Sequence, residues 1–229
     1  MSRVLPLVLV LAALSACSPP PRGIAKTGSA AAPANSTAMG AQAPSDAPAG
    51  QYKMDLSHTS VNFRISHMGL SFYTARFTRM DGVLHFNPAN PAAQSVSATI
   101  DVRSFQTNYP DPQQLDFDTK IENDFLGATA HPQITFKSTK VEPTGPRTAR
   151  VTGDLTLKGV TKPVVLETTY NGGYKPSAMD PGSRVGFSAH GKFKRSDFGL
   201  TAGLPAPGTT LGVGDEIEVI IETEFTRAP

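Results

Sequence analysis

Hydrophobic and polar residues alternate along most of the chain after residue 50. In the last such segment, Ile217, Val219 and Ile221 occupy one set of alternate positions, and glutamates occupy most of the other set. Because successive side chains of a β-strand point to opposite faces, this pattern predicts strands with one buried face. About nine short strands are predicted, at residues 61–66, 71–77, 80–86, 96–103, 133–141, 150–157, 163–170, 184–193 and 216–225.

A single segment departs from this alternation. Phe117, Ile121 and Phe125 recur every four residues up to residue 127, which is the spacing of one helix face. The preceding pair Asp111-Pro112 places a capping residue before a proline, as at many helix starts. We therefore predict one helix that begins at residue 112 and ends before residue 127.

These elements indicate an all-β fold, namely a closed or nearly closed antiparallel β-barrel of about eight strands with one or two short helices. Closure is favoured because it removes exposed strand edges. An outer-membrane barrel needs an apolar outward face, and the glutamates of the last segment argue against one. At eight strands the interior is either filled by side chains or wide enough for one small ligand.

The chain contains 12 Phe and no Trp, and most of the Phe residues fall on the apolar phase of their segments. The pattern leaves open whether these positions form a plain core or line a ligand cavity. The interior positions that we assign are Phe63, Ile65, Phe77, Phe86, Ile100, Phe125, Phe136, Leu155, Leu157, Phe187 and Phe193.

The first 17 residues have the composition of a targeting signal. A short basic start at Arg3 is followed by an apolar run, Val4–Leu14, which is too short to span a bilayer core of about 30 Å. The run ends in Leu14-Ser15-Ala16-Cys17, which resembles the lipobox of bacterial lipoproteins. Residues 1–17 are therefore predicted to be a lipoprotein signal, with Cys17 as the lipidated residue. The alternative is ordinary cleavage after Ala16, which leaves Cys17 as a free thiol in a periplasmic protein.

The residue after Cys17 is Ser18, and in this position the chain resembles the lipoproteins that are sorted to the outer membrane. The predicted location is therefore periplasmic, with a lipid anchor in the outer membrane. Residues 18–50 consist mainly of Ala, Pro, Gly, Ser and Thr, so we predict a disordered linker before a folded domain at residues 51–229.

Net charge argues against nucleic acid as a partner. The totals of 21 basic and 19 acidic residues become equal after residue 50, once Arg3, Arg22, Lys26 and Asp46 are set aside. Proteins that bind the phosphate backbone normally carry a basic face or a basic domain, and this domain is formally neutral.

The candidate catalytic chemistry is sparse. Asp55, His58 and His67 form a compact group that could serve a metal hydrolase, but the sequence has neither H-E-x-x-H nor two His spaced three to five residues apart. G-x-S-x-G is also missing. We predict no catalytic residue and no metal site, and keep a hydrolase built on these three residues as an alternative.

Six separated motifs occur in the order and spacing of a known family, the YceI-like proteins. They are Asp55-x-x-His58, His67-Met68-Gly69-Leu70, Ile100-Asp101 with Ser104-Phe105-Gln106-Thr107, Asp124-Phe125-Leu126 with His131-Pro132-Gln133-Ile134-Thr135-Phe136-Lys137-Ser138, Gly153–Val164, and Arg195-Ser196-Asp197-Phe198-Gly199. The resemblance covers residues 51–226. It implies a lipocalin-like barrel whose apolar tunnel holds a long isoprenoid chain, such as a polyprenyl quinone, or another long-chain lipid. It implies no catalytic activity, and no cofactor beyond that lipid.

With this resemblance, the eleven interior positions become the predicted lipid cavity. We predict His67, Arg195 and Asp197 as polar groups at its mouth that orient the lipid head, with a plain turn contact between Arg195 and Asp197 as the alternative. The family tends to carry a basic residue and a His where this chain has Asp111-Pro112-Gln113-Gln114, so a head-group contact made through that His is not carried over.

The predicted function is that of an envelope lipid carrier, store or stress-related binding protein. The predicted partners are an isoprenoid quinone or other long-chain lipid, and the membrane through acylated Cys17. A membrane-tethered protein-interaction module without bound lipid is the second hypothesis, and a homodimer stays open.

Overall fold

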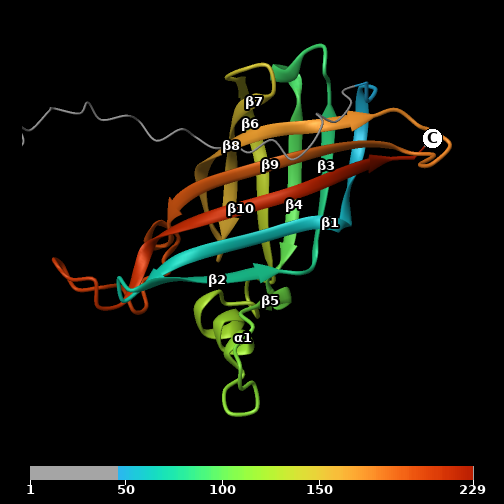
Figure 1. Cartoon of the computed structure of the whole chain (residues 1–229). Helices are drawn as coiled ribbons and strands as arrows, with labels where there is room; N and C mark the ends of the chain where they lie inside the picture. The colour runs from blue at the N-terminus through green and yellow to red at the C-terminus, as the bar shows by residue number, and fades with distance from the viewer. Residues whose placement is uncertain (1–45, 229) are drawn as a thin grey trace, which may run out of the picture. The chain divides into compact units, whose positions relative to one another are not determined.

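A computed structural model describes residues 46–228, and strands form in it where the alternation predicts them (Figure 1). The predicted bounds of two strands, β2 and β3, agree with the structure to the residue. The strands are β1 (Gly50–His67), β2 (Ser71–Phe77), β3 (Met80–Phe86), β4 (Ser95–Asp101), β5 (Phe105–Gln106), β6 (Gln133–Pro143), β7 (Thr148–Leu157), β8 (Val160–Tyr174), β9 (Ser183–Lys194) and β10 (Val213–Arg227).

Eight of these strands close into an antiparallel barrel in the order β10-β9-β8-β7-β6-β4-β3-β1, with a final pairing between β1 and β10. The long strand β1 makes closure possible because it has two partners along one edge. Gly50–Lys53 pair with β3, and Val61–His67 pair with β2, while the other edge pairs with β10. Residues 56–59 form a bulge opposite residue 223, between these two parts of β1.

A corner at Thr78 and Arg79 separates β2 from β3. The Thr78 amide donates to the Ser104 carbonyl at 3.0 Å, and the Ser104 hydroxyl donates to the Asp101 carbonyl at 2.7 Å. After the corner, β3 pairs with β4 and with residues 50–53 of β1. Before it, β2 pairs with residues 61–67 of β1 and with the two-residue strand β5, so β2 lies outside the order of the eight barrel strands. The sequence pattern did not predict β5, because two residues are too few to show a period.

The predicted helix is present but shorter and later than expected. Its helical residues are α1 (Phe117–Lys120) and a π-helical turn, Ile121–Phe125, below the barrel in Figure 1. The prediction of a start at residue 112 was wrong, because Asp111 accepts a bond from the Gln114 amide at 3.1 Å and so closes a turn. Asp116 is the true N-cap and accepts from the Thr119 amide at 3.0 Å.

Buried apolar residues form two clusters. The larger contains Phe77, Phe105 and Phe198, and Ile121 and Leu126 from the helical segment pack against it. The smaller contains Tyr52, Phe86 and Val185. None of the helices in residues 46–228 has the length and apolar character needed to span a bilayer.

The predicted signal at residues 1–17, including Cys17, and most of the predicted linker lie outside the described residues. The linker boundary at residue 50 needs correction, because residues 46–50 belong to the folded domain. Ala47 is only 4% exposed, and the Asp46 amide donates to the Gly173 carbonyl at 3.2 Å.

Candidate functional site

The barrel encloses a cavity of about 880 Å³ between the inward faces of its strands. This volume lies within the range of about 300–1,000 Å³ that is common for ligand pockets. All eleven residues that the sequence places inside line it: Phe63, Ile65, Phe77, Phe86, Ile100, Phe125, Phe136, Leu155, Leu157, Phe187 and Phe193. The inward phase of the strands was therefore assigned correctly, and what these residues bind is a separate question.

The cavity wall is mainly apolar and aromatic: its described lining contains no Asp, Glu or Lys, and its charged members are Arg147 and Arg195. Phe63 stacks on Phe105 with ring centroids 5.6 Å apart. Towards the smaller buried cluster, Tyr170 lies 5.6 Å from Phe86 and 5.4 Å from Phe187, again between ring centroids. A wall of this kind offers little to a charged solute and much contact to a long apolar chain.

The cavity has further lining residues that the sequence pattern did not assign. Most of them continue a phase that was already visible, as Tyr170 does on β8 and Tyr73 on β2. Arg147 gave no such signal, because it lies in the turn between β6 and β7 where no alternation exists. The additional strand residues include Met54, Leu84, Val96, Leu166, Ile217 and Val219.

The three predicted mouth residues have different places in the structure. His67, at the end of β1, lines the cavity. Arg195 also lines it, yet its side chain is almost fully buried. The prediction that Asp197 lies at the cavity mouth was wrong. Asp197 is exposed and does not line the cavity, because the turn Arg195–Phe198 directs Phe198 rather than Asp197 into the core.

Arg195 holds backbone rather than an open polar mouth. Its guanidinium donates to the carbonyls of Leu200 at 2.7 Å, Gly214 at 2.8 Å, and Ala202 and Val213 at 2.9 Å each. These bonds tie the loop between β9 and β10 to the start of β10. The alternative, a turn contact between Arg195 and Asp197, is not among the hydrogen bonds of the described residues, whereas the neighbouring Ser196 hydroxyl donates to Asp215 at 2.8 Å.

Polar groups also lie where the β6–β7 turn meets the cavity. The Arg147 guanidinium lies over the Tyr170 ring, 5.4 Å from its centroid, and Nη1 donates to the Asn171 carbonyl at 2.7 Å. The Tyr170 hydroxyl is buried and has no hydrogen-bond partner within residues 46–228. Burial raises the pKa of this hydroxyl, so it is a neutral donor at physiological pH.

Replacing Tyr170 with Phe is expected to leave the free energy of unfolding unchanged or to raise it by about 1 kcal/mol, because it removes a buried hydroxyl without a partner. Tyr52→Phe is the matched control. The Tyr52 hydroxyl donates to the Pro48 carbonyl at 2.7 Å, so this variant should lose about 1 kcal/mol. Urea unfolding of both variants measures the difference, and equal losses would show that the Tyr170 hydroxyl is bonded.

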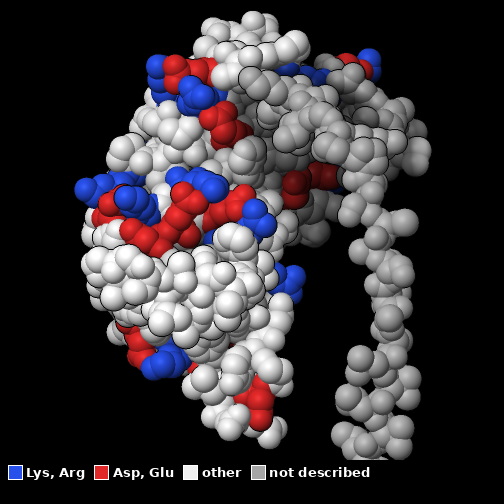
Figure 2. All heavy atoms as spheres, turned by 60° about the vertical axis from the view of Figure 1, so that its left-hand side comes forward, with Lys and Arg blue, Asp and Glu red and all other residues white. Residues whose placement is uncertain are grey.

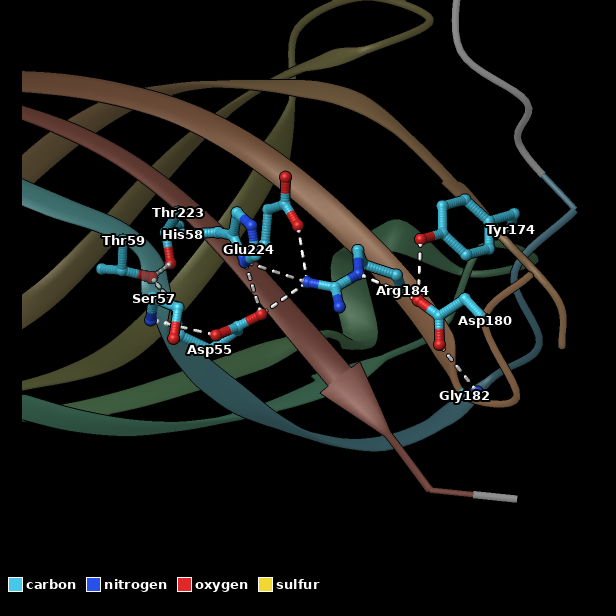
Figure 3. Close-up of polar contacts among 10 residues, drawn as sticks. All are labelled: Asp55, Ser57, His58, Thr59, Tyr174, Asp180, Gly182, Arg184, Thr223 and Glu224. Atoms are coloured by element: carbon cyan, nitrogen blue, oxygen red, sulfur yellow. Dashed lines mark hydrogen bonds and ion pairs between the residues drawn. The ribbon is translucent and has the colours of Figure 1, made fainter.

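Asp55 and His58 belong to a group of polar side chains on the outside of the barrel, next to the β1 bulge (Figure 3). Asp55, His58 and Glu224 offer ligand atoms within 4.8 Å of one another. Arg184 already lies among them: its Nη1 donates to Asp55 Oδ2 at 2.5 Å and to Glu224 Oε2 at 2.7 Å. The structure does not bring His67 to this group, because His67 pairs with residue 213 at the other end of β10.

This polar group is best explained as support for the bulge. The Ser57 amide donates to Asp55 Oδ1 at 3.0 Å, and the Thr59 hydroxyl donates to the Asp55 carbonyl at 2.8 Å. Hydrogen bonds from Arg184 and then His58 lower the pKa of Asp55 from 3.8 to about 2. Asp55 is thus held ionised as the partner of an arginine, which does not fit a general base or a vacant metal site.

Asp55→Asn is expected to cost about 2 kcal/mol of unfolding free energy at pH 7. Folding lowers the pKa of Asp55, so its stabilisation is complete above pH 3.8 and is lost as the pH falls towards 2. The gap between native protein and variant should therefore close over this window in urea unfolding. Glu216→Gln, which breaks the exposed pair with Lys192, should cost less than about 0.5 kcal/mol. A pH-independent gap for Asp55→Asn would contradict the assignment.

Comparison with known proteins places this barrel among relatives. The sequence model of the YceI-like domain matches residues 52–225. The chain belongs to the YceI-like family. The YceI protein of Shigella flexneri is 41% identical to it over 184 residues, which cover 78% of this chain and 87% of that protein.

Solved structures of YceI-like proteins have the same architecture. The YceI protein of Campylobacter jejuni is 30% identical, with a TM-score of 0.60, and the match covers 72% of this chain and 91% of that one. A polyisoprenoid-binding domain of Saccharophagus degradans is 15% identical, with a TM-score of 0.57 and coverage of 78% and 98%. The second likeness shows the fold alone. The predicted family and the all-β barrel fold are both confirmed.

Proposed function

We propose that the cavity binds the apolar chain of an isoprenoid lipid, such as a polyprenyl quinone, or another long-chain lipid. The observation that carries this proposal is the aromatic and aliphatic wall, which has no Asp, Glu or Lys among its described lining residues. Relative to water, each buried CH₂ group contributes about 0.8 kcal/mol, so the cavity wall can keep a chain of several isoprene units out of the aqueous phase as a bilayer does.

Membership of the YceI-like family supports lipid binding, because a neighbour of the same fold is a polyisoprenoid-binding domain. Binding rather than catalysis also fits the outer polar group, where Arg184 occupies the space between Asp55 and Glu224. We propose that the protein is a lipid carrier or store, with His67 at one end of the cavity as a polar group near the lipid head.

We propose an envelope location on the basis of the leader. Its basic start, short apolar run and Leu14-Ser15-Ala16-Cys17 sequence favour export and acylation of Cys17, with an anchor in the outer membrane. Mass spectrometry of the mature protein tests this part. A mass that begins at Cys17 with acyl chains supports it, and an unmodified Cys17 overturns the anchor.

Native mass spectrometry tests the lipid. The full chain with Cys17→Ser, expressed and purified without detergent, should carry a stoichiometric ligand that organic extraction releases as an isoprenoid or other long-chain lipid. A protein that stays free of ligand after incubation with quinones and fatty acids would overturn the proposal. It would favour an interaction module in which the barrel serves only as a scaffold.

A further inference from the structure

Large apolar side chains are exposed at one end of the barrel. Leu70 and Phe72, in and after the β1–β2 turn, are 87% and 61% exposed. Leu211, in the loop before β10, is 72% exposed, and Met68 is 39% exposed. We call these four residues the apolar tip. Isolated exposed apolar residues are common, but a group of four from two loops marks an interaction site.

The two loops of the apolar tip are joined through the backbone. The Met68 amide donates to the Gly212 carbonyl at 2.7 Å, and the Leu70 amide donates to the His67 carbonyl at 3.0 Å. Met68 and Gly69 have φ values of 56° and 69°, so the turn has the positive φ at both central residues that tight hairpins use. The apolar tip therefore has a defined backbone conformation, in which the two loops are hydrogen-bonded to each other.

Among the described residues, one arginine contacts the apolar tip: the Arg64 guanidinium lies over the Phe72 ring, 5.0 Å from its centroid. Residues 65–75 and 198–214 contain no Lys, Arg, Asp or Glu. Figure 2 turns this end of the barrel forward and shows a broad uncharged area below a band of charged groups. A charged side chain is costly to move out of water, and the two segments that carry Leu70 and Leu211 avoid this cost.

Some backbone polar groups of the longer loop are bonded within the protein. The Leu204 amide donates to the Thr201 carbonyl at 3.3 Å, and the Val213 amide donates to the Gly203 carbonyl at 2.7 Å. Arg195 satisfies four carbonyls at the ends of this loop, as described above, and Pro205 and Pro207 have no amide hydrogen. Each such bond lowers the cost of bringing this loop against an apolar medium.

The apolar tip is also continuous with the cavity. His67, which precedes Met68, and Val213, which follows the loop of Leu211, both line the cavity and pair with each other. Leu70, Phe72 and Leu211 do not line it. A ligand that leaves the cavity at this end therefore passes directly alongside exposed apolar side chains.

We infer that the apolar tip docks onto the surface of a lipid bilayer, with Leu70, Phe72 and Leu211 entering the interfacial region, and that lipid is exchanged with the cavity at this end. Docking rests only on the surface, whereas the exchange rests on the proposed lipid-binding function. A bilayer fits better than a protein partner, because the tip combines exposed apolar side chains with a single basic group, Arg64 at Phe72, which suits the interface of a bilayer that contains anionic lipid.

The absence of Trp from the chain gives a direct test. Single variants Leu70→Trp, Leu211→Trp and Met179→Trp are made in the full chain with Cys17→Ser, and mixed with vesicles of phosphatidylethanolamine and phosphatidylglycerol. Met179 is the control because it is apolar, 98% exposed and lies in the β8–β9 loop. Docking predicts a blue shift, and quenching by brominated acyl chains, for the Trp residues at positions 70 and 211 only. Unchanged emission at both, or equal quenching at all three, would overturn it.

Transfer of a long isoprenoid lipid between vesicles tests the second part. Leu70→Asp with Leu211→Asp should slow transfer by about tenfold or more, while native mass spectrometry shows unchanged lipid retention, and Met179→Asp should transfer normally. Normal transfer by the double variant would overturn exchange at the tip. Trp quenching without any retained lipid would leave docking standing and remove the proposed function. Retained lipid without quenching would leave the proposed function standing and overturn docking.

Discussion

Replacing Arg195 with Ala is expected to lower the free energy of unfolding by about 3–5 kcal/mol. The side chain is 5% exposed and donates to four backbone carbonyls. Bonds from a charged donor are stronger than neutral ones, and their loss leaves buried carbonyls without this partner. The loop between β9 and β10 should lose its order with them. Urea unfolding, with hydrogen exchange of the amides in this loop, measures both effects.

Two further variants separate geometry from charge. Arg195→Lys keeps the charge, but a point-like ammonium cannot reach carbonyls on different sides as the planar guanidinium does, so it should recover less than half of the loss. Arg150→Ala removes an arginine from an exposed pair with Glu167 and should cost less than about 1 kcal/mol. A loss of that small size for Arg195→Ala would show that its four bonds contribute little.

Strand positions were predictable because burial on one face imposes a period of two. β2 and β3 were placed to the residue, and the Glu-rich outer face of β10 pointed away from the interior as expected. Closure was harder to predict in detail, since it depends on β1 changing partners from β3 to β2 at a bulge. No local pattern marks that change. The helix start was misplaced because Asp111 and Asp116 are both plausible caps in sequence.

The cavity wall was predictable for the same reason as the strands, since an inward phase is apolar whether the interior is filled or hollow. The polar residues were not. Arg195 was assigned to the mouth from its motif, but its partners are backbone carbonyls of residues 200–214, and carbonyls leave no trace in a sequence. Arg147 and the apolar tip depend on turns, where side-chain direction follows from tertiary structure rather than from a period.

Narrowing the cavity is expected to weaken lipid binding more than a hundredfold. Ala98 on β4 and Ala189 on β9 both line the cavity, so Ala98→Phe with Ala189→Phe places two rings in its interior. At about 0.8 kcal/mol per buried CH₂, exclusion of one five-carbon unit of the ligand costs about 3–4 kcal/mol, which is more than a hundredfold in Kd. Titration with a fluorescent isoprenoid analogue measures the loss.

The matched control places the same two rings on the outside of the same strands. Ser97 and His190 precede and follow the altered alanines, are exposed and do not line the cavity, so Ser97→Phe with His190→Phe should bind the analogue as the native protein does. Thermal unfolding of both double variants checks that the barrel is intact, since overpacked interiors lose stability. Equal affinity in the two variants would mean that the ligand lies outside the cavity. Loss confined to the inward pair places the lipid chain between β4 and β9.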